Sequence, residues 1–225
     1  PADAILTGLD AMCDKFGFPK NDIKRVSYGT TVGTNALIQR TGGRVALVTT
    51  KGFRDLLEIG RQTRPHMYDL QKDYPAPLVD RKYRIELNER IGAAGEIVRA
   101  PSAEDIDIAI DAVINAGADA CAIGFVFSFR NDEHEQQFAN ALRKRAPGIA
   151  ISVSSEVQPE FREYERLSTT VLNAYLQPVM WHYLETLEAG IAIRAPNASL
   201  GINQSSGGLM SVRRSREFPV RTALS

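Results

Sequence analysis

Apolar residues near the start of the chain recur at the spacing of an amphipathic helix. Ile5, Leu9, Met12 and Phe16 follow one another at intervals of three or four residues, which places them on one helical face. We therefore expect a helix over Asp3–Phe16.

Short apolar segments alternate with polar turns through the rest of the first hundred residues. Glycine, proline and clusters of polar residues mark the ends of these segments. The pattern predicts strands over Asp22–Tyr28 and Arg44–Thr50, helices over Asn35–Arg40 and Gly52–Ile59, a loop over Arg61–Asp80, and a strand pair over Lys82–Leu87 and Glu96–Arg99.

The middle of the chain has the clearest pattern. Asp119–Phe127 is a continuous apolar run, typical of a parallel strand covered on both faces. A helix over Asn131–Arg145 and a strand over Ile149–Val153 are expected after it. The short connections between these elements predict a βαβ unit. An earlier helix is expected to begin at Ser102, which resembles the first residue of a capping box.

The last third is expected to contain one long helical segment and one strand. Arg162–Ala189 is long enough for one helix or two, and Pro178 is expected to kink or divide it. Ser199–Gln204 is expected to be a strand that enters a polar turn. Domain boundaries are expected in the Arg61–Asp80 loop and near Glu156–Glu160.

The composition excludes several classes of protein. The 225 residues are 44% apolar, enough for one large core or two small ones, and 27 basic residues balance 27 acidic ones. A neutral chain offers no basic face for nucleic acid or an anionic membrane, and no apolar run approaches the roughly 20 residues that span a bilayer. Cys13 and Cys121 are isolated in apolar surroundings, which predicts reduced core thiols and a cytoplasmic protein.

The first candidate for chemistry is the segment Tyr28–Asn35, between a predicted strand and a predicted helix. Gly29 permits close approach of the backbone, and Thr30 and Thr31 offer hydroxyls to an anion. An ordinary capped turn accounts for the same residue types.

The second candidate is the segment Gly60–His66. Arg61 and Arg64 lie beside Pro65, where they would clamp a carboxylate or polarise a carbonyl. Surface arginines on a solvated loop are the alternative.

The three histidines do not indicate acid–base catalysis. His66 has neither a base nor a metal beside it in the sequence. His134 is expected on a solvated helix face, and His182 is expected to pack beside Trp181.

Two further polar segments are candidates for a cleft wall. Arg162–Tyr175 combines dense charge with hydroxyls, which indicates either an interface or a solvated helix face. Asn203–Gly208 is a polar turn at the end of a predicted strand, where α/β proteins often bind ligands; a hairpin turn is the alternative. No cluster has the spacing of zinc ligands, and no Gly-x-Ser-x-Gly sequence indicates a serine hydrolase.

Taken together and in this order, these segments resemble the hydantoinase A/oxoprolinase family. That family includes ATP-dependent N-methylhydantoinases, 5-oxoprolinases, and the ATP-using subunits of acetone and acetophenone carboxylases. The resemblance runs through residues 28–40, 46–55, 58–62, 64–65, 159–160, 162–166, 168–170, 173–176 and 204–208.

The resemblance implies an α/β fold similar to the actin, sugar-kinase and Hsp70 ATPases, with two ribonuclease-H-like lobes around a nucleotide cleft. Residues 1–65 would belong to the N-terminal lobe, 66–160 to an inserted α/β subdomain, and 161–225 to a helix and the start of the second lobe. The family's phosphate hairpin, Asp-x-Gly-Gly-Thr-Phe-Thr-Asp, usually precedes the position of Pro1, and a second phosphate loop usually follows Ser225. The chain is therefore expected to be an incomplete, internal segment, with most Mg²⁺ ligands in that hairpin.

Two positions depart from the family pattern. Tyr28 stands where the family usually has His, and Ser206 where it usually has Asn. The first departure puts a general-acid or ligand role at position 28 in doubt, and either one could mark a subfamily with a different substrate.

The resemblance implies an ATP- and Mg²⁺-dependent hydrolase for cyclic amides of the hydantoin or oxoproline type, in which ATP phosphorylates the carbonyl oxygen. An ATP-using subunit of a ketone carboxylase is the alternative, and a non-catalytic binding or assembly module is the third reading. A second, hydantoinase B-type subunit and an oligomer are the expected partners.

The resemblance also implies roles for particular residues. Thr30, Thr31, Arg61 and Arg64 would be catalytic, with the threonines near phosphate or the substrate oxygen and the arginines on the substrate. These positions are expected to converge on one crevice with the remaining binding residues, which are Gly29, Asn35, Glu165, Arg166, Thr169, Asn173, Gln204, Ser205 and Gly207.

Overall fold

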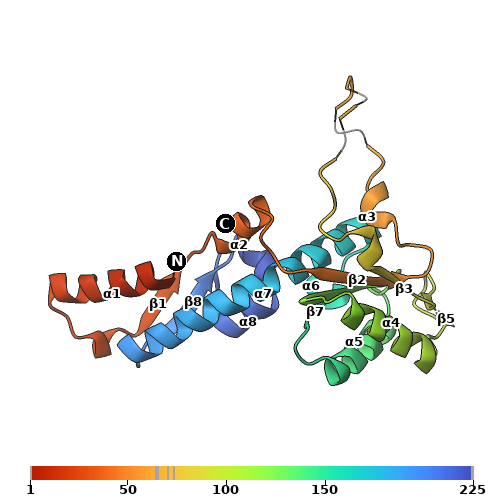
Figure 1. Cartoon of the computed structure of the whole chain (residues 1–225). Coiled ribbons are helices and arrows are strands. Elements are labelled where there is room, and N and C mark those ends of the chain that lie inside the picture. Colours follow the sequence, from red (N-terminus) through yellow and green to blue (C-terminus); the bar gives the residue numbers. More distant parts are fainter. Residues whose placement is uncertain (1, 64–65, 70, 73, 224–225) are drawn as a thin grey trace. The chain divides into compact units, whose positions relative to one another are not determined.

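The computed structural model describes residues 2–63, 66–69, 71–72 and 74–223 (Figure 1). The chain divides into two compact units. The first combines residues 1–42 with residues 176–225, and the second is the continuous segment 43–175.

The second unit is built on a four-stranded parallel sheet with the order β3-β2-β6-β7. β2 and β6 are buried along their whole length, which explains their nearly continuous apolar sequence. The strands are β2 (Val45–Thr50), β3 (Arg84–Leu87), β6 (Ala120–Gly124) and β7 (Ala150–Val153).

Helices α4 (Ala103–Asn115) and α5 (Glu133–Arg145) pack against one face of this sheet (Figure 1). Their apolar residues share a core with Cys121, Ile123 and Val153. The Ser102 hydroxyl accepts a hydrogen bond from the Asp105 amide at 3.0 Å, so the predicted helix cap is confirmed. Each helix returns the chain to the start of the next parallel strand, and the predicted βαβ unit is confirmed as β6-α5-β7.

The first part of helix α7 (Glu163–Arg194) covers the opposite face of the same sheet. Leu167 lies against Gly124, and the Asn173 amide donates to the Ser152 hydroxyl at 2.9 Å. Gly124 and Ser152 alternate along their strands with residues of the α4–α5 core, so they face the other side.

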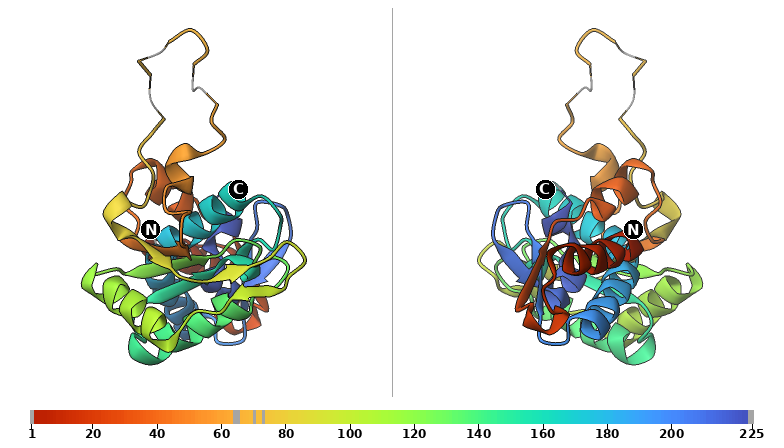
Figure 2. Two further views of the ribbon diagram at one scale, coloured as in Figure 1. Left: turned by 90° about the vertical axis from the view of Figure 1, so that its right-hand side faces the viewer. Right: turned by 90° about the vertical axis from the view of Figure 1, so that its left-hand side faces the viewer.

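Small elements complete the second unit. They are α3 (Leu56–Ile59), the 3-10 turn η2 (Arg81–Tyr83), the antiparallel pair β4 (Arg90–Ile91) and β5 (Ile97–Arg99), and α6 (Ser154–Val157). The described parts of the connection between α3 and η2 extend away from the sheet (Figures 1 and 2).

The first unit is built on a mixed three-stranded sheet with the order β1-β8-β9. β1 runs parallel to β8, and β8 runs antiparallel to β9. Apolar residues of α1 and of the second part of α7 pack with this sheet in one core. The elements are α1 (Ala2–Phe16), the 3-10 turn η1 (Lys20–Asp22), β1 (Arg25–Tyr28), α2 (Val32–Ile38), β8 (Ser199–Asn203), β9 (Leu209–Ser211), α8 (Val212–Glu217) and the 3-10 turn η3 (Pro219–Thr222).

Two expectations about strands and domains differ from the structure. The segments 82–87 and 96–99 do not pair with each other: β3 joins the parallel sheet beside β2, and β5 pairs with β4. Both expected domain boundaries, in 61–80 and 156–160, fall inside the second unit. The strands before and after the 61–80 loop hydrogen-bond to each other. Arg166 on α7 donates to the carbonyls of Glu160 and Phe125, which keeps the chain after 156–160 in the same unit.

Single residues give mixed outcomes. Pro178 lies inside one helix and does not divide it, so that part of its prediction is wrong. Cys13 and Cys121 are both buried and free, and burial raises the pKa of the Cys121 thiol. Among the described helices, none combines the length and apolar character needed to cross a membrane.

Candidate functional site

In the first unit, the end of β1 meets the end of β8. The register pairs Tyr28 with Ile202, so Gly29 and Asn203 follow at neighbouring strand ends. A Cβ on Gly29 would lie 3.5 Å from the Asn203 side-chain nitrogen. The first and last candidate segments, far apart in the sequence, therefore come together here because two parallel strands end at the same edge.

The threonines after β1 differ in what their hydroxyls do. Thr30 is buried, and its hydroxyl accepts a hydrogen bond from the Val32 amide at 3.1 Å. Thr31 is exposed and precedes α2 without making a side-chain capping bond. The Thr34 hydroxyl donates to the Ala223 carbonyl. Asn35 is exposed on α2. Thr31 therefore has the hydroxyl that the local fold uses least.

A tyrosine pair lies beside this loop. The rings of Tyr28 and Tyr183 are 6.4 Å apart between centroids. Burial raises the pKa of Tyr183, and hydrogen bonding to Tyr28 adds to the shift. The Tyr183 phenol is therefore neutral at physiological pH.

The polar segment after β8 is a hairpin turn. Asn203 pairs with Leu209 across β8 and β9, and the Gln204 amide donates to the Gly208 carbonyl at 3.0 Å. Gly207 and Gly208 adopt positive φ angles of 92° and 83°, which favour glycine.

The same turn is anchored to the end of the chain. Ser205 donates to the Arg221 carbonyl through its amide at 2.9 Å and its hydroxyl at 2.7 Å. The Ser205 hydroxyl is therefore structural, whereas Gln204 and Gly207 remain candidates.

In the second unit, the other two candidate segments meet. Arg61 donates from Nε to a Glu165 carboxylate oxygen at 2.6 Å. Hydrogen bonding from its own backbone amide and from Arg61 lowers the pKa of Glu165. Arg61 is exposed, so in the described part of the chain its terminal guanidinium nitrogens face solvent. Arg64 and Pro65 lie outside the described residues.

Arg166 is completely buried, which excludes the solvated-face alternative at this residue. Its guanidinium donates to the Ser154 hydroxyl at 3.2 Å, the Glu160 carbonyl at 2.7 Å and the Phe125 carbonyl at 2.8 Å. Burial lowers the pKa of Arg166. With each guanidinium nitrogen bonded to a protein atom, this arginine connects α7 to the ends of β6 and β7.

Two other residues on the helix also make internal contacts. Asn173 is buried against Ser152. The Thr169 hydroxyl donates to the Glu165 carbonyl one turn earlier at 2.9 Å. Of the candidates on α7, Glu165 is the one whose side chain contacts Arg61, so it is the one placed to share a ligand with it.

Sequence reasoning missed a set of buried polar side chains at the carboxyl ends of the parallel strands. Glu135 accepts from the Phe125 amide at 2.9 Å, the Ser154 hydroxyl at 2.6 Å and the Ser155 amide at 3.0 Å. Burial raises the pKa of Glu135, although these hydrogen bonds oppose the shift.

His134 belongs to the same set, and the expectation that it is solvated is wrong. It is 2% exposed, and its Nδ1 lies 2.7 Å from a carboxylate oxygen of Glu89. The other Glu89 oxygen accepts from the Thr50 hydroxyl.

A sequence signal for this burial exists. His134 and Glu135 lie one turn before Phe138 and Ala139, on the apolar face of α5. The charges on these residues concealed that periodicity.

The expectation that His182 packs is also wrong. His182 is exposed, and Trp181 is 52% exposed with the Arg216 guanidinium carbon 5.2 Å from its ring centroid.

Among the described residues, no group of three or more His, Cys, Asp or Glu side chains is arranged to hold a metal ion.

These features define an α/β protein with mixed and parallel sheets, whose polar candidates lie at the ends of β1 and β8 and between α3 and α7. A family model described as the hydantoinase/oxoprolinase N-terminal region matches residues 1–146, and one described as hydantoinase/oxoprolinase matches residues 166–225. The chain belongs to the hydantoinase/oxoprolinase family.

Relatives with named activities include two enzyme subunits. The caprolactamase subunit alpha of Pseudomonas jessenii is 37% identical over 212 residues, which cover 92% of this chain and 30% of the relative. The acetophenone carboxylase gamma subunit of Aromatoleum aromaticum is 32% identical over 195 residues, which cover 78% of this chain and 26% of the relative.

A solved structure shares the fold. The ATP-dependent caprolactamase of Pseudomonas jessenii superimposes with a TM-score of 0.84 at 35% identity, covering 98% of this chain and 33% of that one. The chain thus spans about a third or less of the length of these relatives.

Proposed function

We propose that the chain is part of an enzyme that uses ATP to hydrolyse a cyclic amide. The observation that carries the proposal is the similarity to caprolactamase, in sequence and fold, across nearly the whole chain. The proposal includes a fold of the actin, sugar-kinase and Hsp70 ATPase class, as well as assembly with a second, hydantoinase B-type subunit. The subunit names of the relatives support such an assembly.

The chemistry explains why ATP would be needed. An amide carbonyl is a poor electrophile because nitrogen donates electron density to it. When bound, ATP would supply a phosphoryl group to the carbonyl oxygen, so that water could open the ring C–N bond with release of ADP, phosphate and the ring-opened amino acid.

The residues of this chain would position the reactants. The exposed hydroxyl of Thr31 and the close backbone approach at Gly29 suit contact with phosphate or the activated oxygen. The exposed guanidinium of Arg61, oriented by Glu165, suits a substrate carbonyl or carboxylate. We assign no residue of this chain to Mg²⁺, because the described residues provide no cluster that fits it.

A ketone carboxylase subunit is the second candidate, favoured by the similarity to the acetophenone carboxylase gamma subunit. ATP turnover distinguishes the two. We expect ADP formation by the full-length protein, with its partner subunit, to rise with caprolactam, hydantoin or 5-oxoproline. Stimulation only by a ketone with bicarbonate would replace the first proposal with the second.

A non-catalytic role is the remaining outcome of the same assay. Absence of ATP turnover with every amide and ketone, in a protein that is folded and assembled, would indicate a binding or assembly module.

A further inference from the structure

A cavity of about 190 Å³ in the second unit is lined by three cationic side chains. This volume is below the roughly 300–1,000 Å³ of pockets for drug-sized ligands, so it suits a small molecule. The lining residues are Lys51, Asn88, Glu89, Arg90, Val98 and Arg99.

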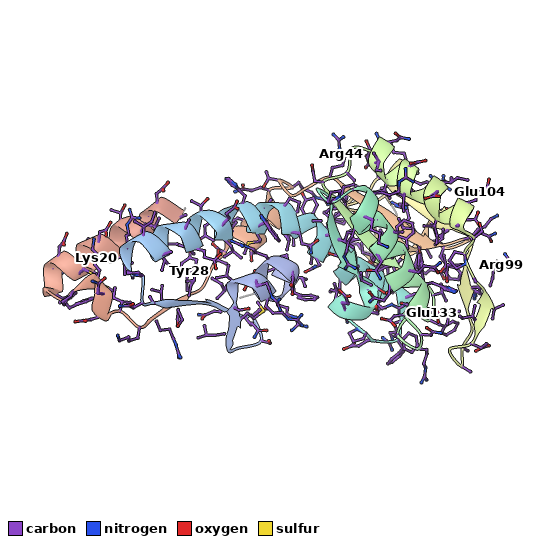
Figure 3. The ribbon with its side chains drawn as sticks, turned by 90° about the horizontal axis from the view of Figure 1, so that it is seen from below. Lys20, Tyr28, Arg44, Arg99, Glu104 and Glu133 are labelled. Atoms are coloured by element: carbon purple, nitrogen blue, oxygen red, sulfur yellow. The ribbon has the colours of Figure 1, made fainter. Side chains whose placement is uncertain are left out.

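The cavity lies at the carboxyl ends of two neighbouring parallel strands. Lys51 directly follows β2, and Asn88 and Glu89 follow β3, its partner in the sheet. The β4–β5 hairpin supplies the remaining wall, and Figure 3 labels Arg99 on it. Open α/β sheets bind ligands at this end of their strands.

Two of the cations are opposed across the hairpin. Arg90 pairs with Arg99 in the β4–β5 register, and like charges directly opposite each other destabilise a strand pair. Arg99 donates to the Asn88 side-chain oxygen at 2.9 Å, and the Arg90 guanidinium carbon lies 5.2 Å from the Phe53 ring centroid. These contacts orient both guanidinium groups without neutralising either one.

The nearby carboxylates are engaged elsewhere. The two oxygens of Glu89 bind Thr50 and His134, and Glu86 accepts from the Gly52 amide at 2.7 Å. Within the described part of the chain, neither of these carboxylates forms an ion pair with the three cations of the cavity. The wall therefore keeps an excess of positive charge.

We propose that this cavity binds a phosphate group, either free or as the monoester of a small molecule. A phosphate presents enough oxygens for both guanidinium groups and the Lys51 ammonium from one tetrahedral centre, whereas a dicarboxylate divides its four oxygens between two separate groups. Binding would also relieve the repulsion between Arg90 and Arg99. The proposed amide reaction uses none of these residues, so the two proposals stand or fall separately.

Calorimetric titration of the full chain with inorganic phosphate, glycerol 3-phosphate and malonate tests the site at constant ionic strength, because salt screens such contacts. We expect phosphate or its monoester to bind more tightly than malonate. Arg90→Gln and Arg99→Gln should each weaken that binding by about tenfold or more, the loss of one charge-assisted contact. The matched control is Arg143→Gln, an exposed arginine on α5, which should bind as the wild type does.

Thermal unfolding gives a second readout. Phosphate should raise the unfolding temperature of the wild type. The Arg99→Gln variant should have a higher unfolding temperature than the wild type without any ligand, because the repulsion with Arg90 is removed, and phosphate should not raise it further. The proposal is overturned by no phosphate binding, by binding unchanged in the Arg90→Gln/Arg99→Gln double variant, by equal loss in the control, or by binding of malonate alone.

Discussion

Two buried carboxylates in the second unit are hydrogen-bonded through both of their oxygens. Glu135 holds the ends of β6 and β7, and Glu89 connects Thr50 to His134. A buried carboxylate without such donors would be costly. These carboxylates therefore help to fix the ends of the strands. A charged residue type at these positions does not indicate exposure to solvent.

The pH dependence of stability should report on Glu135. A carboxyl whose pKa is higher in the folded state binds more protons when folded, so the free energy of unfolding falls as pH rises. The stabilisation that protonated Glu135 contributes is fully present below the ordinary pKa of 4.5 and is lost as pH rises through the raised pKa of the folded state.

Glu135→Gln should abolish this part of the slope in urea denaturation between about pH 4.5 and 8. Glu133→Gln is the matched control, because Glu133 is exposed on the same turn of α5 (Figure 3). An identical slope in wild type and Glu135→Gln would contradict the raised pKa.

Thr31 and Thr34 should separate catalysis from stability. Thr31→Val should lower kcat/KM of amide-stimulated ATP hydrolysis by about 10- to 100-fold, the loss of a hydrogen bond to a charged group. Its unfolding midpoint should not change, since the hydroxyl caps nothing.

Thr34→Val should instead lower the free energy of unfolding by about 1 kcal/mol, because its hydroxyl donates to Ala223. Thr7→Val, at an exposed position on α1, is the neutral control for both measurements. Normal kinetics in Thr31→Val would remove Thr31 from the site.

At the scale of elements, local signals predicted the longer helices and the strands of the parallel sheet, but not the short elements β4, β9, α6 and α8. Strand pairing was less predictable still. Ser102 and the apolar face of α4 predicted that helix, because both depend on neighbours within a few residues. The partner of β3 was not predicted, because β2 lies more than thirty residues away. A hairpin between 82–87 and 96–99 was the shorter and more local alternative.

The contact between β6 and α7 depends on Gly124. A Cβ there would lie 2.8 Å from Cδ1 and 3.0 Å from Cγ of Leu167. Gly124→Ala should therefore cost about 1–3 kcal/mol of unfolding free energy, and Leu167→Ala about 2–5 kcal/mol through the space it leaves.

The double variant should cost less than the sum, because the new methyl group occupies part of that space. Urea denaturation measures all three variants. Gly148→Ala, where an added Cβ meets nothing within 4 Å, should change stability by no more than about 0.5 kcal/mol. Strict additivity in the double variant would show that the two residues do not touch.

At the scale of the whole molecule, the two units differ in continuity along the chain. The second is one uninterrupted segment with its own core, whereas the first needs residues from both ends. In the first unit, β8 hydrogen-bonds to β1 at the other end of the sequence.

We therefore expect the segment Gly43–Tyr175 to fold when expressed alone, with a cooperative urea transition followed by circular dichroism. The segment Leu176–Ser225 alone should show no cooperative transition, because β1 and α1 are missing from its core. A cooperative transition in the second fragment, or none in the first, would contradict this division.

The amino-acid sequence by itself determined the order of the longer helices and strands, the helix cap, the buried parallel strand and the family, since each depends on local periodicity or on ordered motifs. Only the tertiary structure decided that Gly29 meets Asn203, that Arg61 meets Glu165, and that Arg166, His134 and Glu135 are buried. Those outcomes depend on strands and helices that are distant in sequence packing together, and burial of a charge depends on which donors and acceptors that packing brings to it.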